Sequence, residues 1–157
     1  MKRILIEGLS VLLLGLFIFA MMRDGGVSGL SAPEIEKHLQ EAGLLQAENK
    51  AAERDIKRKL RLDASAYEGV VYYTGSDFMD VSEFLLIKAG DETRLDEVEA
   101  AVSAYLEKQK TTFENYGTNQ FDLLEHAHIW RRGDYFLLTV GENGEALWNA
   151  ARKEIER

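Results

Sequence analysis

Two charged residues, Glu83 and Lys88, stand at the two ends of an apolar run, where a carboxylate and an ammonium group could bind a polar ligand or anchor the fold. In a strand, residues five apart point to opposite faces, so these two side chains are not expected to form a simple pair. An inward-facing Glu83 could instead hydrogen-bond the predicted turn at 116–120. We interpret Glu83 as a structural polar anchor; ligand binding and catalysis are the alternatives.

Two other groups of residues have the chemistry of metal ligands. His126 and His128 would share one face of a strand, but a zinc site needs a third or fourth ligand and the sequence has no cysteine. Asp77, Asp80 and Glu83 could bind calcium, but the spacing of an EF-hand loop with its central glycine is absent. We therefore predict no metal and no cofactor, with the two histidines as the alternative.

The tripeptide Arg132-Gly133-Asp134 matches the integrin-binding motif, but it stands where two predicted strands must be connected. Gly-Asp is typical of a tight turn, and we interpret it as one. The sequence contains no nucleophile elbow and no phosphate-binding glycine loop. These observations favour a protein without catalytic activity.

The N-terminus has the pattern of a membrane segment. Positions 4–22 form an apolar run that only Glu7 interrupts, and Lys2 and Arg3 precede it. As a helix this run would extend about 28 Å, close to the roughly 30 Å hydrocarbon core of a bilayer. Basic residues favour the cytoplasmic end of a membrane helix, so the chain after position 23 is predicted to lie outside. The alternative is a cleaved signal peptide and a secreted protein, although no clear cleavage site follows.

We therefore divide the chain into a signal anchor or signal peptide (1–23), a glycine-rich linker (24–30) and an extracytoplasmic α+β domain (31–157), of which 31–62 is a helical lead-in. The full chain has a net charge of −8, and removing the first 23 residues, with three basic and one acidic residue, leaves −10. Such a domain is poorly suited to nucleic acid, and we expect no nucleic-acid partner. Without cysteine it has neither disulfides nor a lipid-attachment site.

The hydrophobic periodicity after the linker predicts helices and strands in a repeated order. Ser31 and Glu34 have the spacing of a capping box. Strand-strand-helix occurs twice, which predicts an α+β fold with a four-stranded, mostly antiparallel sheet and helices packed on one face, preceded by an N-terminal membrane helix. The predicted elements are helices at 31–43 and within 46–61, strands 70–74 and 83–88, a long helix from 93 to 117, a short helix at 120–125, strands 127–132 and 135–140, and a terminal helix from 146.

Five basic residues gather near the end of the second predicted helix. We interpret them as a solvated helix face; the alternative is a docking patch for an acidic partner. They are Arg54, Lys57, Arg58, Lys59 and Arg61.

Several short segments between about Tyr67 and Ala146 form an ordered series: Val71-Tyr72-Tyr73, the run from Met79 to Lys88, Gln109, Phe113-Glu114-Asn115-Tyr116, Gln120 and Gly133-Asp134-Tyr135. This series resembles the domain-of-unknown-function family number 4358, an uncharacterised family of exported proteins and lipoproteins in Gram-positive bacteria. The resemblance implies an envelope location, a small α/β domain and no established activity. It nominates Glu83, Lys88, Tyr116 and Gln120 as ligand-binding residues or structural anchors. The chain departs from the family in lacking a proline after Tyr116 and a lipid-attachment cysteine.

The sequence thus predicts a membrane-tethered, non-catalytic interaction or accessory module of the bacterial cell envelope. It would be held to the membrane through residues 4–22, and a sheet face without helices would bind a protein partner or form a homodimer. The alternatives are a small cell-envelope hydrolase, which needs a perturbed acid or base in a pocket, and a solute- or lipid-binding module, which needs an apolar cavity.

Overall fold

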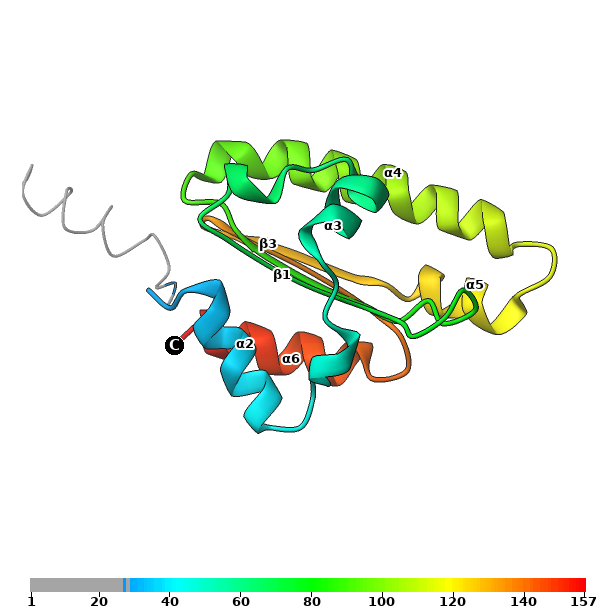
Figure 1. Ribbon diagram of the computed structural model, residues 1–157, viewed down its shortest axis with the longest axis horizontal. Coiled ribbons are helices and arrows are strands. Elements are labelled where there is room, and N and C mark those ends of the chain that lie inside the picture. Colours follow the sequence, from blue (N-terminus) through cyan, green and yellow to red (C-terminus); the bar gives the residue numbers. More distant parts are fainter. Residues whose placement is uncertain (1–26, 28) are drawn as a thin grey trace, which may run out of the picture.

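The computed structural model describes residue 27 and residues 29–157 and shows a sheet between two layers of helices (Figure 1). The predicted membrane helix and most of the linker lie outside the described residues. Within those residues, no helix is long and apolar enough to cross a membrane.

Four strands form one sheet in the order β1-β2-β4-β3, and each neighbouring pair is antiparallel. Two hairpins build it, β1 with β2 and β3 with β4, and the second strand of each hairpin lies in the centre. These strands confirm the predicted antiparallel sheet. Their bounds are Gly69–Thr74 (β1), Glu83–Lys88 (β2), His128–Arg132 (β3) and Tyr135–Val140 (β4).

Within the described residues, five α-helices pack around this sheet. The charged stretch 46–61, predicted as one helix, is a 3₁₀ turn (Ala47–Asn49) followed by α3. The long helix is preceded by another 3₁₀ turn, in which the Asp91 side chain accepts a hydrogen bond from the Thr93 N–H. The capping box at the start of α2 is confirmed, because the Ser31 backbone N–H donates to Glu34 Oε2 over 2.7 Å. The helices are α2 (Ala32–Glu41), α3 (Glu53–Leu60), α4 (Leu95–Phe113), α5 (Thr118–Glu125) and α6 (Gly144–Ile155).

The prediction that all helices pack on one face is wrong. Helices α3, α4 and α5 contribute to a core on one face, and α2 and α6 to a second core on the other (Figure 1). The central strands explain why: consecutive residues of β2 point to opposite faces, yet five of its six residues are buried. Leu85 and Ile87 enter the first core, while Phe84 and Leu86 enter the second. No bare sheet face remains among the described residues to bind a partner.

The helical lead-in is an integral part of the domain rather than an appendage. After α2 the chain crosses the edge of the sheet, where the Ala51 N–H donates to the Tyr72 carbonyl over 2.9 Å and Lys50 forms an isolated bridge with Tyr73. Helix α3 then packs on the opposite face through Ile56 and Leu60. This crossing segment, residues 50–60, places Lys50 on one side of β1 and Lys59 on the other.

Candidate functional site

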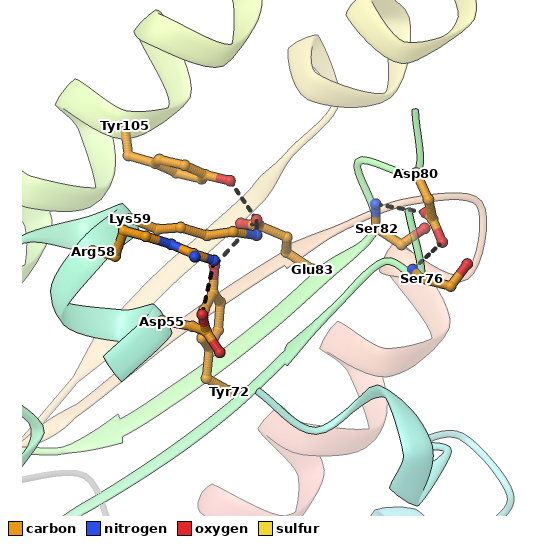
Figure 2. Close-up of polar contacts among 9 residues, drawn as sticks. All are labelled: Asp55, Arg58, Lys59, Tyr72, Ser76, Asp80, Ser82, Glu83 and Tyr105. Carbon is orange, nitrogen blue, oxygen red and sulfur yellow. Dashed lines mark hydrogen bonds and ion pairs between the residues drawn. The ribbon is translucent and has the colours of Figure 1, made fainter. Parts of the chain in front are cut away.

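Glu83, the strongest sequence candidate, is the centre of a buried polar cluster on the α3–α4 side of the sheet. Its side chain is 5% exposed. Its Oε1 accepts hydrogen bonds from the hydroxyl of Tyr105, from the hydroxyl of Tyr72 over 3.1 Å and from Lys59 Nζ over 3.3 Å (Figure 2). We call these four residues the Glu83 cluster. The predicted partner of Glu83, the turn at 116–120, is not among its hydrogen-bond donors.

Each member of the Glu83 cluster is placed by a different element. Glu83 opens β2 and faces the same side as Leu85; Tyr72 lies on β1, two residues before Thr74, which pairs with Glu83. Tyr105 belongs to the buried stripe of α4, and Lys59 precedes Leu60, which anchors the end of α3. Sequence reasoning singled out Glu83 but missed the convergence of the two tyrosines on its carboxylate.

Burial controls the electrostatics of the cluster. Loss of water raises the pKa of the Glu83 carboxyl, against the opposing effects of the Tyr105 hydrogen bond and the Lys59 charge. Burial also raises the pKa of Tyr72 and of Tyr105, and the nearby Glu83 carboxylate reinforces both shifts. The two hydroxyls therefore stay protonated at neutral pH and act as hydrogen-bond donors.

A second cluster, which the sequence did not reveal, lies on the other side of β1. Glu36 of α2 is 6% exposed. Its Oε1 accepts from the Tyr73 hydroxyl over 2.6 Å, and Lys50 Nζ lies 2.7 Å from Oε1 and 2.8 Å from Oε2. Gln40 Nε2 donates to the same tyrosine hydroxyl over 2.7 Å. We call these residues the Glu36 cluster; the adjacent tyrosines at 72 and 73 were its only sequence signal.

Lys88 lies at the opposite end of β2 from Glu83 and on the other face, as the strand spacing predicted. Its Nζ lies 3.0 Å from Glu68 Oε1 and 5.5 Å from the centre of the Tyr135 ring. Lys88 and Glu83 are therefore parts of separate arrangements.

Tyr116 precedes Gly117 between α4 and α5, and Gln120 lies in the first turn of α5. Tyr116 is 59% exposed and its ring centre lies 5.6 Å from that of Phe113. Gln120 lines a cleft of about 430 Å³ at the end of the sheet, which Glu83 also lines. The structure thus brings Gln120 near Glu83 across this cleft but leaves Tyr116 on the surface.

The two histidines do not form the predicted pair. His126 follows α5 rather than lying in β3, and its Nδ1 lies 2.8 Å from the Asp122 carbonyl oxygen. His128 begins β3, and its ring centre lies 5.4 Å from that of Trp148. Across residues 29–157 and residue 27, no three His, Asp or Glu side chains are close enough to hold a metal ion.

The acidic residues before Glu83 stabilise their own loop. Asp77 Oδ1 accepts from the Met79 N–H over 2.8 Å, and Asp80 accepts from the backbone N–H groups of Ser76 (3.1 Å) and Ser82 (3.0 Å) (Figure 2). These hydrogen bonds stabilise the β1–β2 connection, and they direct the carboxylates at backbone N–H groups rather than at a shared ion.

Gly133 adopts a φ of 56° in the β3–β4 hairpin, which confirms the predicted turn at 132–134.

The β1–β2 connection also carries exposed apolar side chains. Phe78 is 73% exposed and Met79 is 43% exposed. The Phe78 ring centre lies 5.9 Å from that of Phe113, next to Tyr116. This end of the domain therefore combines the sheet-end cleft, the Glu83 cluster and an exposed aromatic surface.

The comparison with known proteins identifies the family without adding an activity. No curated protein and no solved structure is significantly similar to this chain. The family whose profile matches is described as Domain of unknown function (DUF4358), and the match covers residues 41–141. It includes the whole sheet, the crossing segment and the Glu83 cluster, but not Glu36 or helix α6. The chain belongs to the DUF4358 family.

Proposed function

We propose that this DUF4358 protein is a membrane-tethered, extracytoplasmic accessory module of the bacterial cell envelope that performs no covalent chemistry. The apolar run 4–22 would anchor it with the N-terminus in the cytoplasm, and the acidic domain would lie outside. Cleavage of the segment, which would release the domain, is the alternative outcome.

One observation carries the non-catalytic part of this proposal. The buried groups with strongly perturbed pKa values on the α4 side, Glu83, Tyr72 and Tyr105, are hydrogen-bonded to one another. Perturbed groups mark active sites when they are free to react, but structural networks perturb pKa values as well. Here burial is the main cause of the raised pKa values, and each tyrosine proton is engaged by the carboxylate.

The fold also separates the tether from the candidate site. The Tyr135 hydroxyl donates to the Leu30 carbonyl, and Tyr135 pairs with Lys88 at the end of β2. Glu83 lies five residues away at the other end, or about 17 Å along the strand. A domain held through residues before Leu30 would therefore carry the Glu83 cluster and the β1–β2 connection at the end away from the tether (Figure 1).

The absence of cysteine allows a direct test of location. Ser103→Cys places one thiol on the exposed side of α4, and Lys2→Cys places one before the apolar run. In intact cells, a membrane-impermeant maleimide should label the first variant and not the second, while lysis should make both reactive. The membrane fraction should contain the chain at full-length mass. Protection of Ser103→Cys in intact cells would refute the proposed location.

A further inference from the structure

The sheet-end cleft has the size of a small-molecule site. Its volume is about 430 Å³, within the roughly 300–1,000 Å³ of typical ligand pockets. Four separate parts of the chain line it: the segment after α2, the β1–β2 connection, the start of α5 and the β4–α6 connection. They meet beyond the ends of β1, β2 and β4 (Figure 1). A ligand in this cleft would therefore contact loops and helix ends rather than lie along a strand.

Carboxamide side chains are concentrated in the sheet-end cleft. Five of the nine Asn and Gln residues of the chain line it, namely Gln46, Asn49, Asn119, Gln120 and Asn143. Gln46 donates to a backbone carbonyl over 3.5 Å, whereas the side chains of the other four form no hydrogen bond with any residue that the structure describes. Each free carboxamide offers two donor hydrogens and one acceptor oxygen. The cleft therefore presents uncharged donors and acceptors side by side.

The charges around the cleft disfavour an anionic ligand. Among the described residues that line it there is no lysine, arginine or histidine. Of its three carboxylates, that of Asp80 is engaged by two backbone N–H groups (Figure 2), and that of Glu83 is buried. The third, Glu142, is exposed. An anion would meet negative charge here without a cation to pair with it. The cleft is thus suited to a neutral ligand with many hydrogen-bonding groups.

Exposed aromatic rings adjoin the carboxamides. The ring centres of Phe78 and Tyr116 lie 5.9 Å and 5.6 Å from that of Phe113. Gly117 links this aromatic surface to the cleft, because a methyl group added there would come within 2.6 Å of Phe113 Cδ1 and 3.0 Å of Gln120 Oε1. A saccharide has the complement of both surfaces, since its hydroxyl groups both donate and accept hydrogen bonds and its C–H faces pack on aromatic rings.

We propose that the sheet-end cleft binds a neutral saccharide, whose hydroxyl or acetamido groups pair with the four free carboxamides and whose C–H faces pack on Phe78 and Tyr116. A neutral peptide would also pair with carboxamides. Extended peptides, however, are commonly bound by adding a strand to an open sheet edge, and this cleft lies across strand ends. The inference concerns the ligand alone and holds whether the domain is tethered or released, so its test is independent of the location test.

Saturation-transfer difference NMR on the full-length chain, in a detergent without a sugar headgroup, tests the proposal with three neutral probes. Cellobiose carries hydroxyl groups, N,N′-diacetylchitobiose adds acetamido groups, and N-acetyl-alanyl-alaninamide is a peptide. At least one disaccharide should bind saturably with a Kd of about 10 mM or tighter, and the peptide at least roughly tenfold more weakly than that disaccharide. Peptide binding within tenfold of the better disaccharide, or no saturable binding of either disaccharide, would overturn the proposal.

Variants then locate the site. Asn119→Ala and Asn143→Ala should each weaken disaccharide binding by roughly three- to tenfold, the loss expected for one hydrogen bond. Both side chains are exposed and form no hydrogen bond within the described residues, so the variants should fold as the parent does. Asn149→Ala is the matched control, because Asn149 is an exposed carboxamide of α6 that does not line the cleft. Parent-like binding by the double variant at 119 and 143, or an equal loss in the control, would place the ligand elsewhere and refute the assignment.

Discussion

The Glu83 and Glu36 clusters are built from the same kinds of residue on opposite sides of one strand. Adjacent tyrosines of β1, Tyr72 and Tyr73, point to opposite faces, and each donates to a buried glutamate. The crossing segment supplies a lysine to each, Lys59 and Lys50. The two clusters together fasten the helical lead-in to both faces of the sheet.

The clusters differ in where the glutamate comes from and in how fully it is bonded. Glu36 is on a helix, and its two oxygens are satisfied by a lysine that remains 48% exposed. Glu83 is on a central strand, where the backbone fixes its position, and one of its oxygens has no partner in the described residues. A buried carboxylate is costly unless fully paired. The Glu36 carboxylate is thus bonded through both oxygens, and the Glu83 carboxylate through one.

The largest effect is expected from Glu83→Ala. The change leaves the hydroxyls of Tyr72 and Tyr105 buried without an acceptor and removes the partner of Lys59. Breaking a buried pair in this way should lower the free energy of unfolding by about 3–5 kcal/mol. Urea denaturation followed by circular dichroism measures it. A loss below about 1 kcal/mol would show that the cluster does not stabilise the fold.

High pH should weaken both clusters, and the Glu36 cluster first. Burial and the bond to Glu36 raise the pKa of Tyr73 to about 12, and burial raises the pKa of Tyr72 and of Tyr105 as well. The folded protein then keeps protons that the unfolded chain releases above about pH 10. Stability is complete below that pH and falls as pH rises, by up to about 1.4 kcal/mol per pH unit for each such tyrosine.

Tyrosinate absorbance and urea midpoints between about pH 9 and about pH 11 test whether ionisation of these tyrosines is delayed. At the upper pH, the native protein should show fewer ionised tyrosines than the six of the denatured chain. Tyr73→Phe should lower by one the number of tyrosines that stay protonated at that pH. Simultaneous ionisation of all tyrosines near pH 10 would contradict the buried donor role of these hydroxyls.

A smaller loss is expected from Glu36→Ala. Tyr73 keeps the hydrogen bond from Gln40, and Lys50 can return to water because it is already half exposed. The free energy of unfolding should fall by about 1–2 kcal/mol, as for one lost hydrogen-bonded group. The same urea experiment compares it with Glu83→Ala. A loss equal to that of Glu83→Ala would remove the proposed difference between the clusters.

Local sequence patterns predicted the helices and strands well, because these elements depend on residues that are close together in the chain. The strands β1 and β2, the hairpin turn at Gly133 and the long helix α4 were all recognisable. The error about the helices came from treating two strand-strand-helix units as spatially equivalent. The sequence did contain the contrary signal, since a strand that is apolar on both sides, as at 84–87, needs a helix layer on each face.

The candidate site was predictable only in part because it depends on side chains far apart in the chain. Glu83 was recognisable as a charge at the start of an apolar strand. Its partners come from residues 11 to 24 positions away, on other elements. The crossing of the sheet edge determines which lysine of the basic cluster turns inward. It also determines that Glu36 is buried. No local sequence pattern encodes this crossing.

The smallest expected change in stability concerns the residues at which α2 and α3, the helices beside the two clusters, end. After α2 the chain turns at Gly43, with a φ of 72°, whereas α3 ends on Arg61 with a φ of 62°. Glycine adopts this backbone conformation without the clash that a Cβ causes. Arg61→Gly should therefore raise the free energy of unfolding by about 0.5–1 kcal/mol, and Gly43→Arg should lower it by a similar amount. Urea denaturation of both variants measures the difference, and destabilisation by Arg61→Gly would mean that the Arg61 side chain stabilises the fold by more than its backbone conformation costs.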